Sequence, residues 1–170
     1  GKTLMMSMTE QFFSVEYAKQ TELFKGLAIW EDAAFRKLQG TYPVIFLSFS
    51  GVKENSYKEA RKKICRLIQL LYRRYAFLLE GDLVSEQEKK EFYGISADME
   101  TYEASLSLQQ LSNYLSRYYG KKVIFLLDEY DTPMQEAYVD GFWDEMVGFM
   151  RNLFNATFKG NPYLERAILT

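Results

Sequence analysis

The chain has 170 residues, one domain's worth of sequence, and its net charge is −2. Hydrophobic residues make up 48% and charged residues 26%, with 10 Gly and 3 Pro, which excludes disordered, collagen-like and low-complexity classes. One Cys and no His exclude disulfide frameworks, zinc clusters and imidazole-based catalysis, and the charge leaves nucleic-acid binding only to a local patch.

The first half of the chain predicts helices followed by a buried strand and a long helix. Residues 4–15 carry apolar side chains at helical spacing, and residues 32–38 predict a short helix that ends before a glycine. Residues 44–49 are β-branched and aromatic and predict a buried strand. Residues 57–79 keep the helical spacing longest and therefore predict the most regular helix.

The second half repeats the alternation of helix and strand. Residues 85–92 predict a short helix with a capping box, and residues 106–119 a longer helix stopped by glycine. The continuous apolar run at 123–127, followed by two acids, suits a central parallel strand covered on both faces. A helix at 141–158 precedes a last strand at 166–170. Strands separated by long helical segments predict an α/β fold with a mostly parallel sheet.

The first candidate site is the tripeptide Gly1-Lys2-Thr3, which directly precedes a predicted helix. In a phosphate-binding loop, such a glycine lets the backbone wrap around an anion, and the lysine supplies a positive charge that binds the β and γ phosphates. The threonine hydroxyl then holds Mg²⁺ at the helix N-terminus. A tripeptide also occurs by chance, so the alternative is an ordinary helix start.

The second candidate site lies where the central strand ends in Asp128 and Glu129. An acid at the carboxyl end of a buried parallel strand can bind Mg²⁺ through water, and its neighbour can polarise an attacking water. The alternative is a strand that ends in solvated acids. Thr170 ends the last predicted strand, where a hydroxyl can lie near a γ phosphate. The tripeptide and the acidic pair support each other, because each predicts the other at one sheet edge.

Several segments together resemble one protein family. They are Gly1-Lys2-Thr3-Leu4 with Phe12-Phe13, residues 23–29, residues 43–49, the block Leu126-Leu127-Asp128-Glu129-Tyr130-Asp131-Thr132-Pro133, and Ala167-Ile168-Leu169-Thr170. They resemble the AAA-ATPase-like domain of bacterial proteins that often carry a PD-(D/E)XK nuclease domain at their C-terminus. The resemblance covers residues 1–170 as one domain. It implies a three-layer P-loop NTPase-like fold with an additional strand between the P-loop strand and the Walker B strand.

The resemblance also implies a role for each candidate residue. These roles are the end of Walker A for Gly1, Lys2 and Thr3, Walker B for Asp128 and Glu129, and a sensor-like position for Thr170. ATP and Mg²⁺ are the implied ligands, with Thr3 and Asp128 on the metal and Glu129 as the catalytic residue. The P-loop strand is expected upstream of Gly1, so we interpret the chain as a fragment cut after the sensor strand. Such a fragment is expected to be inactive and to self-associate through the edge left unpaired, whereas the parent protein would be a Mg²⁺-dependent ATPase.

Two neighbouring segments carry opposite charge. Residues 53–74 hold eight Lys or Arg against two Glu, and residues 80–103 hold eight acids against two Lys. A basic helical face can bind nucleic-acid phosphates, with Tyr57, Tyr72 and Tyr75 available to stack on bases. The alternatives are a solvated outer face, or pairing of the two segments with each other.

The sequence thus predicts an ATP-binding and ATP-hydrolysing module coupled to an attached effector domain, nuclease-like by resemblance. Two alternatives stay open: a nucleotide-responsive scaffold with little turnover, and a nucleic-acid-binding module that uses the basic face. No apolar run approaches the ~20 residues of a membrane span, and the cysteine usage suits the cytoplasm. Seven residues are expected to be buried in the core: Phe12, Phe13, Trp30, Cys65, Phe142, Trp143 and Phe149.

Overall fold

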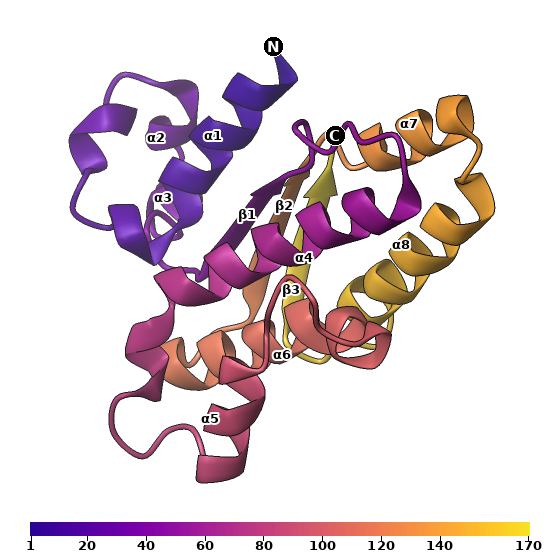
Figure 1. The fold of residues 1–170 in the computed structure, drawn as a ribbon. Helices are drawn as coiled ribbons and strands as arrows, with labels where there is room; N and C mark the ends of the chain where they lie inside the picture. Colours follow the sequence, from indigo (N-terminus) through magenta and orange to yellow (C-terminus); the bar gives the residue numbers. More distant parts are fainter.

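The computed structural model describes residues 1–170 and contains one parallel sheet of three strands (Figure 1). The strands are β1 (Val44–Ser48), β2 (Val123–Asp128) and β3 (Leu164–Leu169), in the order β1-β2-β3. Both pairs are parallel, and every residue of β2 is buried. The predicted α/β class is therefore confirmed, as is the central position of the strand that ends in two acids.

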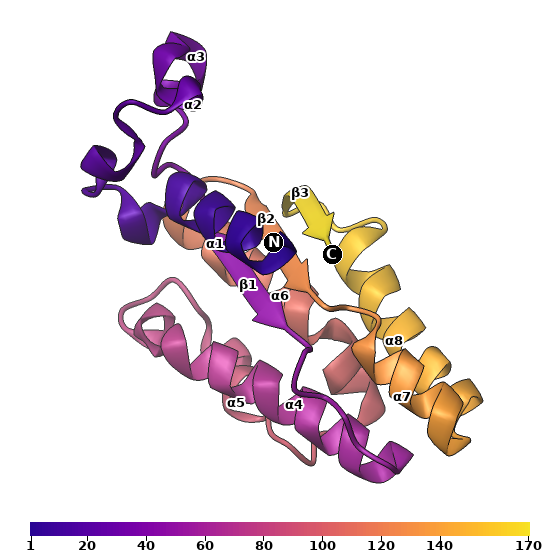
Figure 2. The ribbon, with the colours of Figure 1, turned by 90° about the horizontal axis from the view of Figure 1, so that it is seen from above.

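One face of the sheet is covered by a single helix. Helix α1 (Lys2–Phe13) crosses β1 and β2, and its buried Met6 packs with Val44, Ile124 and Leu126 (Figure 2). The periodic apolar positions early in the chain thus form a helix, as predicted, although it begins at Lys2. Its N-terminus lies at the carboxyl end of the strands, which places the tripeptide at the predicted edge (Figure 1).

The opposite face carries three long helices and the main core of 30 buried residues. These helices are α4 (Tyr57–Arg74), α6 (Thr101–Tyr119) and α8 (Trp143–Phe158), and α6 packs against both of the others. Helix α6 ends at Gly120, whose left-handed φ of 66° suits a residue without a Cβ. Helices on both faces give the three layers that the family resemblance implies.

The remaining helices are short. They are η1 (Val15–Tyr17), η2 (Thr21–Phe24), α2 (Ala28–Glu31), α3 (Ala33–Arg36), η3 (Ala76–Leu79), α5 (Glu86–Tyr93) and α7 (Thr132–Asp140). The capping box expected at α5 is present, because the hydroxyl of Ser85 and the carboxylate of Glu88 each accept a hydrogen bond from the other residue's backbone N–H. None of the helices combines the length and the apolar character that crossing a membrane requires.

Two helix boundaries differ from the prediction. The helix expected over 57–79 ends at Arg74, because Tyr75 leaves helical geometry and donates its hydroxyl to the Val44 carbonyl at 3.2 Å. Helix α6 begins at Thr101 rather than at residue 106, since its first turn is polar and lacks the apolar spacing on which the prediction rests.

The helix expected over 141–158 is part of a pair. Pro133 occupies the first turn of α7, and Gly141, with a φ of 84°, ends α7 and separates it from α8. This turn leaves Trp143 44% exposed, so its predicted core position is wrong, whereas Phe142 and Phe149 are buried as expected. Cys65 is also buried.

Strand β3 has β2 on one side and no strand on the other. Ile168 is paired in register with Leu126 and lies on the face that α1 covers. Leu126 is fully buried there, but Ile168 is 43% exposed. The outer edge of β3 therefore offers unpaired backbone groups beside an exposed apolar side chain, an arrangement that recruits further strands.

We expect residues 1–170 to self-associate through this edge, with a sedimentation coefficient that rises with protein concentration in analytical ultracentrifugation. Replacing Ile168 with Lys should shift the protein toward monomer, because a charge on an edge strand opposes strand pairing. The control is Leu70→Lys on α4, since Leu70 is 42% exposed but belongs to no strand. The same dependence of the sedimentation coefficient on concentration in the two variants would rule out β3 as the interface.

Candidate functional site

Asp128 is the buried acid at the carboxyl end of β2, with only 2% of its surface exposed. Three hydroxyl groups from separate parts of the chain donate to its carboxylate. Thr170 reaches Oδ1 at 3.0 Å, Thr3 reaches Oδ2 at 3.2 Å, and Ser48 reaches Oδ2 at 3.4 Å. A buried carboxylate is costly without such donors, so this convergence is what makes its burial tolerable.

The sheet register places these hydroxyls. Ser48 and Asp128 end neighbouring strands and are direct partners across β1 and β2. Thr170 follows β3 immediately, and its backbone N–H donates to the Leu127 carbonyl at 2.9 Å. Thr3 comes from the first turn of α1, where the helix crosses the sheet. The edge of a parallel sheet and one helix N-terminus thus meet at a single carboxylate.

The first turn of α1 is suited to an anion. Gly1 precedes the helix without a side-chain cap, and no acidic residue lies in the first turn. The backbone N–H groups of Lys2, Thr3 and Leu4 have no acceptor within the protein, as expected for the start of a helix. Lys2 is exposed beside them. These free donors, the helix dipole and the ammonium group together favour a negatively charged ligand.

Glu129 has the one strained backbone conformation outside the glycines. Its φ is 54°, in the left-handed region that costs a residue with a Cβ about 1–2 kcal/mol. The strained residue turns the chain sharply out of β2, so that Asp128 is buried while Glu129 is exposed. Thr132 donates its hydroxyl to Glu129 Oε2 at 3.4 Å. Strain of this kind next to a buried acid is typical of functional sites.

The oxygen atoms around Asp128 suit a hard cation that arrives with its own ligands. The structure has no group of three or more His, Cys, Asp or Glu side chains that could hold a metal ion by themselves. Magnesium in nucleotide sites commonly uses one or two carboxylates and takes its other oxygens from phosphates and water. The Asp128 carboxylate and the adjacent Thr3 hydroxyl fit that donor set.

The structure brings together most of the residues expected from the sequence. Thr3, Asp128 and Thr170 are in direct contact, and Gly1 and Lys2 adjoin them in the chain. Two contributors were missed. They are Ser48, which donates to Asp128 and whose hydroxyl lies 3.0 Å from that of Ser50, and Thr132, which contacts Glu129. A polar residue that ends a strand predicted to run parallel to β2 was a usable signal for Ser48.

A parallel α/β domain with an anion-favouring helix start and a buried acid at one sheet edge is the arrangement of a nucleotide-binding protein. The family model described as "Predicted AAA-ATPase" matches residues 1–170, so the chain belongs to this AAA-ATPase-like family. No curated protein and no solved structure matches the chain. Membership supports nucleotide and magnesium use in general terms.

We expect Glu129→Gly to raise the free energy of unfolding by about 0.5–1 kcal/mol, because glycine adopts the left-handed conformation without strain. Urea denaturation followed by circular dichroism measures this change. Glu136→Gly is the matched control: it makes the same exchange inside α7, where it should lower stability by about 1 kcal/mol. Destabilisation by both variants would show that the turn at Glu129 stores no strain.

Proposed function

We propose that this domain binds ATP with magnesium and that the complete protein hydrolyses it. The observation that carries the proposal is the convergence of Thr3, Ser48 and Thr170 on the buried Asp128, at the end of the sheet where α1 begins. Family membership supports the same chemistry. Hydrolysis would signal to an attached effector domain, for which the resemblance favours a nuclease-like domain.

Each residue of the site has a separate task in this proposal. Lys2 and the free N–H groups at the start of α1, next to Gly1, bind the phosphates. Thr3 and Asp128, whose oxygens are 3.2 Å apart, hold the magnesium ion. The bound ion would neutralise charge on the phosphate oxygens. Thr170 offers its hydroxyl as a sensor of the γ phosphate, because it already contacts Asp128 from the neighbouring strand.

Glu129 is the proposed catalytic residue. It follows Asp128 directly, yet the strained turn places its carboxylate outside the sheet, where water can reach it. The hydroxyl of Thr132 contacts one carboxylate oxygen, which leaves the other free to accept a hydrogen bond from an attacking water. Orienting that water is the step that would separate an ATPase from a protein that only binds nucleotide.

Isothermal titration calorimetry with MgATP tests the binding site. The titration uses residues 1–170 and the same chain with the residues encoded before Gly1, since the resembled loop takes further backbone donors from there. We expect tight binding only in the longer chain. In that chain Lys2→Ala should weaken binding about ten- to hundredfold, as expected for the loss of a charged hydrogen bond.

Lys19→Ala is the matched control for Lys2→Ala, because Lys19 is an exposed lysine remote from Asp128 in sequence and outside any helix or strand. Equal losses in the two variants, or no MgATP binding by the longer chain, would refute the phosphate site. Equally tight binding by both chain lengths would refute the role given to the upstream residues.

Turnover distinguishes the enzyme from a nucleotide-responsive scaffold. In the longer chain, Glu129→Gln should leave MgATP affinity nearly unchanged and lower phosphate release by about 10²–10⁴-fold, the usual contribution of a general base. Glu136→Gln on the neighbouring α7 is the control and should retain full activity. Slow turnover that is identical in all three proteins would favour the scaffold.

A second candidate function is nucleic-acid binding through the outer face of α4. Lys58, Lys62, Arg66 and Arg73 are exposed and share one stripe of this helix. None of the four forms an ion pair, and no ion pair joins residues 53–74 to the acidic segment 80–103, so the pairing considered from the sequence is absent. At 1.5 Å per residue the stripe is about 22 Å long.

The tyrosines considered for base stacking do not all belong to this stripe. Tyr72 and Tyr75 are buried and donate their hydroxyls to backbone carbonyls, so that stacking by these two is excluded. Contacts from α4 would therefore reach phosphates and leave the bases unread, which predicts binding that is independent of sequence and sensitive to salt.

Fluorescence anisotropy with labelled duplex DNA at increasing KCl tests this surface. Changing Lys58, Lys62, Arg66 and Arg73 to Gln should reduce the slope of log K against log salt by about 3–4, since each phosphate contact contributes about 0.9. The control changes Lys19, Lys37, Lys122 and Lys159 to Gln and removes the same charge from other elements. Identical slopes for the two sets would exclude α4 as a DNA-binding face.

A further inference from the structure

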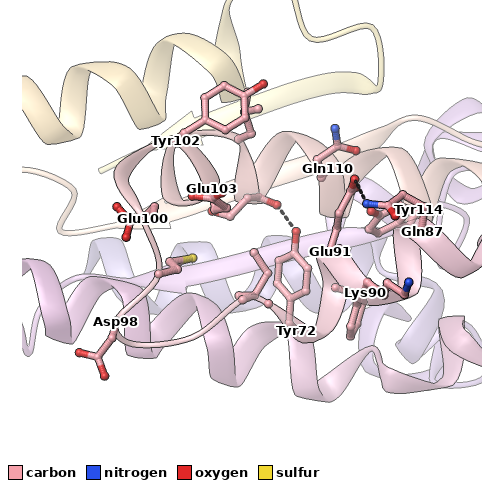
Figure 3. Close-up of a pocket in the computed structure, with 16 residues that line it drawn as sticks. Tyr72, Gln87, Lys90, Glu91, Asp98, Glu100, Tyr102, Glu103, Gln110 and Tyr114 are labelled. Atoms are coloured by element: carbon pink, nitrogen blue, oxygen red, sulfur yellow. Dashed lines mark hydrogen bonds between the residues drawn. The ribbon is translucent and has the colours of Figure 1, made fainter.

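A cavity lies between α5, α6 and the loop that joins them, at the end of the sheet opposite the Asp128 site (Figures 1 and 3). Its volume is about 590 Å³, within the range of ligand pockets. None of the residues that line it belongs to the proposed nucleotide site. Any ligand of this cavity would therefore be distinct from the nucleotide.

The floor of the cavity is apolar and aromatic. Tyr72, Phe92, Met99 and Tyr114 line it and are all buried. The Tyr72 hydroxyl donates to the Ser107 carbonyl at 2.5 Å, and burial raises the pKa of Tyr72 well above its usual value. No buried side-chain nitrogen or oxygen lacks a hydrogen-bond partner. The floor thus offers apolar contact and aromatic rings, with no unmet demand for a polar ligand group.

Charge is distributed unevenly around the mouth of the cavity. Asp98 and Glu100 lie at one end, whereas Lys90 and Glu91 lie at the other (Figure 3). Glu103 adds a third carboxylate from the first turn of α6 to the acidic side of the lining. The end with Asp98 and Glu100 therefore carries negative charge, and the one lysine of the cavity lining, Lys90, lies at the other end.

These carboxylates are not neutralised elsewhere in the protein. None of Asp98, Glu100 and Glu103 takes part in an ion pair. Arg61 approaches from α4, but its guanidinium donates to the Met99 carbonyl at 2.8 Å and to the Thr101 hydroxyl at 3.3 Å. Arg61 thus donates to the loop carbonyl and to the Thr101 hydroxyl, and it does not pair with the acidic side chains.

We infer that this cavity binds a guanidinium group carried on an apolar stem. The group would belong either to an arginine side chain or to a small free molecule such as agmatine. The cation would lie at the end with Asp98, Glu100 and Glu103, where opposite charge attracts it. Its stem would cover the floor formed by Phe92, Met99 and their neighbours. The inference does not depend on nucleotide binding.

A structural role of these acids at the start of α6 has to be distinguished from ligand binding. Glu100 occupies the N-cap position of α6 without a side-chain hydrogen bond to the helix, and Glu103 lies in the first turn, where negative charge interacts favourably with the helix dipole. A purely structural role would lower the melting temperature of a neutralised variant without giving any saturable binding of a cation. Ligand titration and thermal melting therefore report different properties of the same side chains.

The test titrates residues 1–170 with three probes at constant ionic strength, followed by amide chemical shifts in NMR. The probes are guanidinium chloride, agmatine, and a glycine-flanked peptide with one arginine and blocked ends. We expect agmatine or the peptide to saturate shifts in residues 95–106, and guanidinium alone to bind at least about tenfold more weakly because it lacks a stem. Tighter binding of the peptide would identify a polypeptide source, and tighter binding of agmatine a free amine.

The variant D98N/E100Q/E103Q should weaken binding by about tenfold, since three ion-pair attractions are removed. The control E31Q/D140N/E165Q neutralises three exposed acids outside the cavity and should bind as the unmodified protein does. Binding that both variants weaken equally would reflect general charge and overturn the inference. Failure of agmatine and the peptide to saturate any shifts would overturn it as well.

Discussion

The burial of the Asp128 carboxylate constrains the structure at the carboxyl end of the sheet. Asp128 ends the central strand with almost no contact with solvent, so its oxygens must accept hydrogen bonds from the protein or from a ligand. The donors come from α1, β1 and the residue after β3. Strand register, the crossing of α1 and the end of β3 are thereby linked, because a shift in any of them would leave the acid with fewer partners.

Basic and acidic side chains are also kept apart over a longer stretch of the chain. The cations of α4 and the acids between α5 and α6 follow each other in sequence but do not pair. The acidic segment is fixed locally, for example by Arg117, which contacts Glu88 and lowers its pKa. Two surfaces of opposite sign therefore persist side by side in the sequence of one small protein.

The sequence predicts the sheet well because a buried parallel strand is a continuous apolar run, and 123–127 is such a run. The contact between Thr3 and Asp128 also follows from the sequence, since strand ends and a helix start share one edge. Helix α7 was not predicted as a separate element, because it is short and has little apolar periodicity, although the proline in its first turn and the glycine at its end are signals of helix boundaries. The burial of Tyr72 and Tyr75 depends on tertiary contacts of α4, which local spacing does not contain.

The backbone on both sides of Glu129 is hydrogen-bonded to Thr170, so that the carboxyl ends of β2 and β3 are held together. The Tyr130 N–H donates to the Thr170 carbonyl at 3.1 Å, and the Thr170 N–H donates to the Leu127 carbonyl at 2.9 Å. The hydroxyl of Thr170 that contacts Asp128 thus sits on a residue clamped on both sides of the strained turn. Helix α7 starts at Thr132, three residues after Glu129, and packs against α8. A ligand that moved Thr170 would therefore disturb the hydrogen bonds at Leu127 and Tyr130, close to the start of α7.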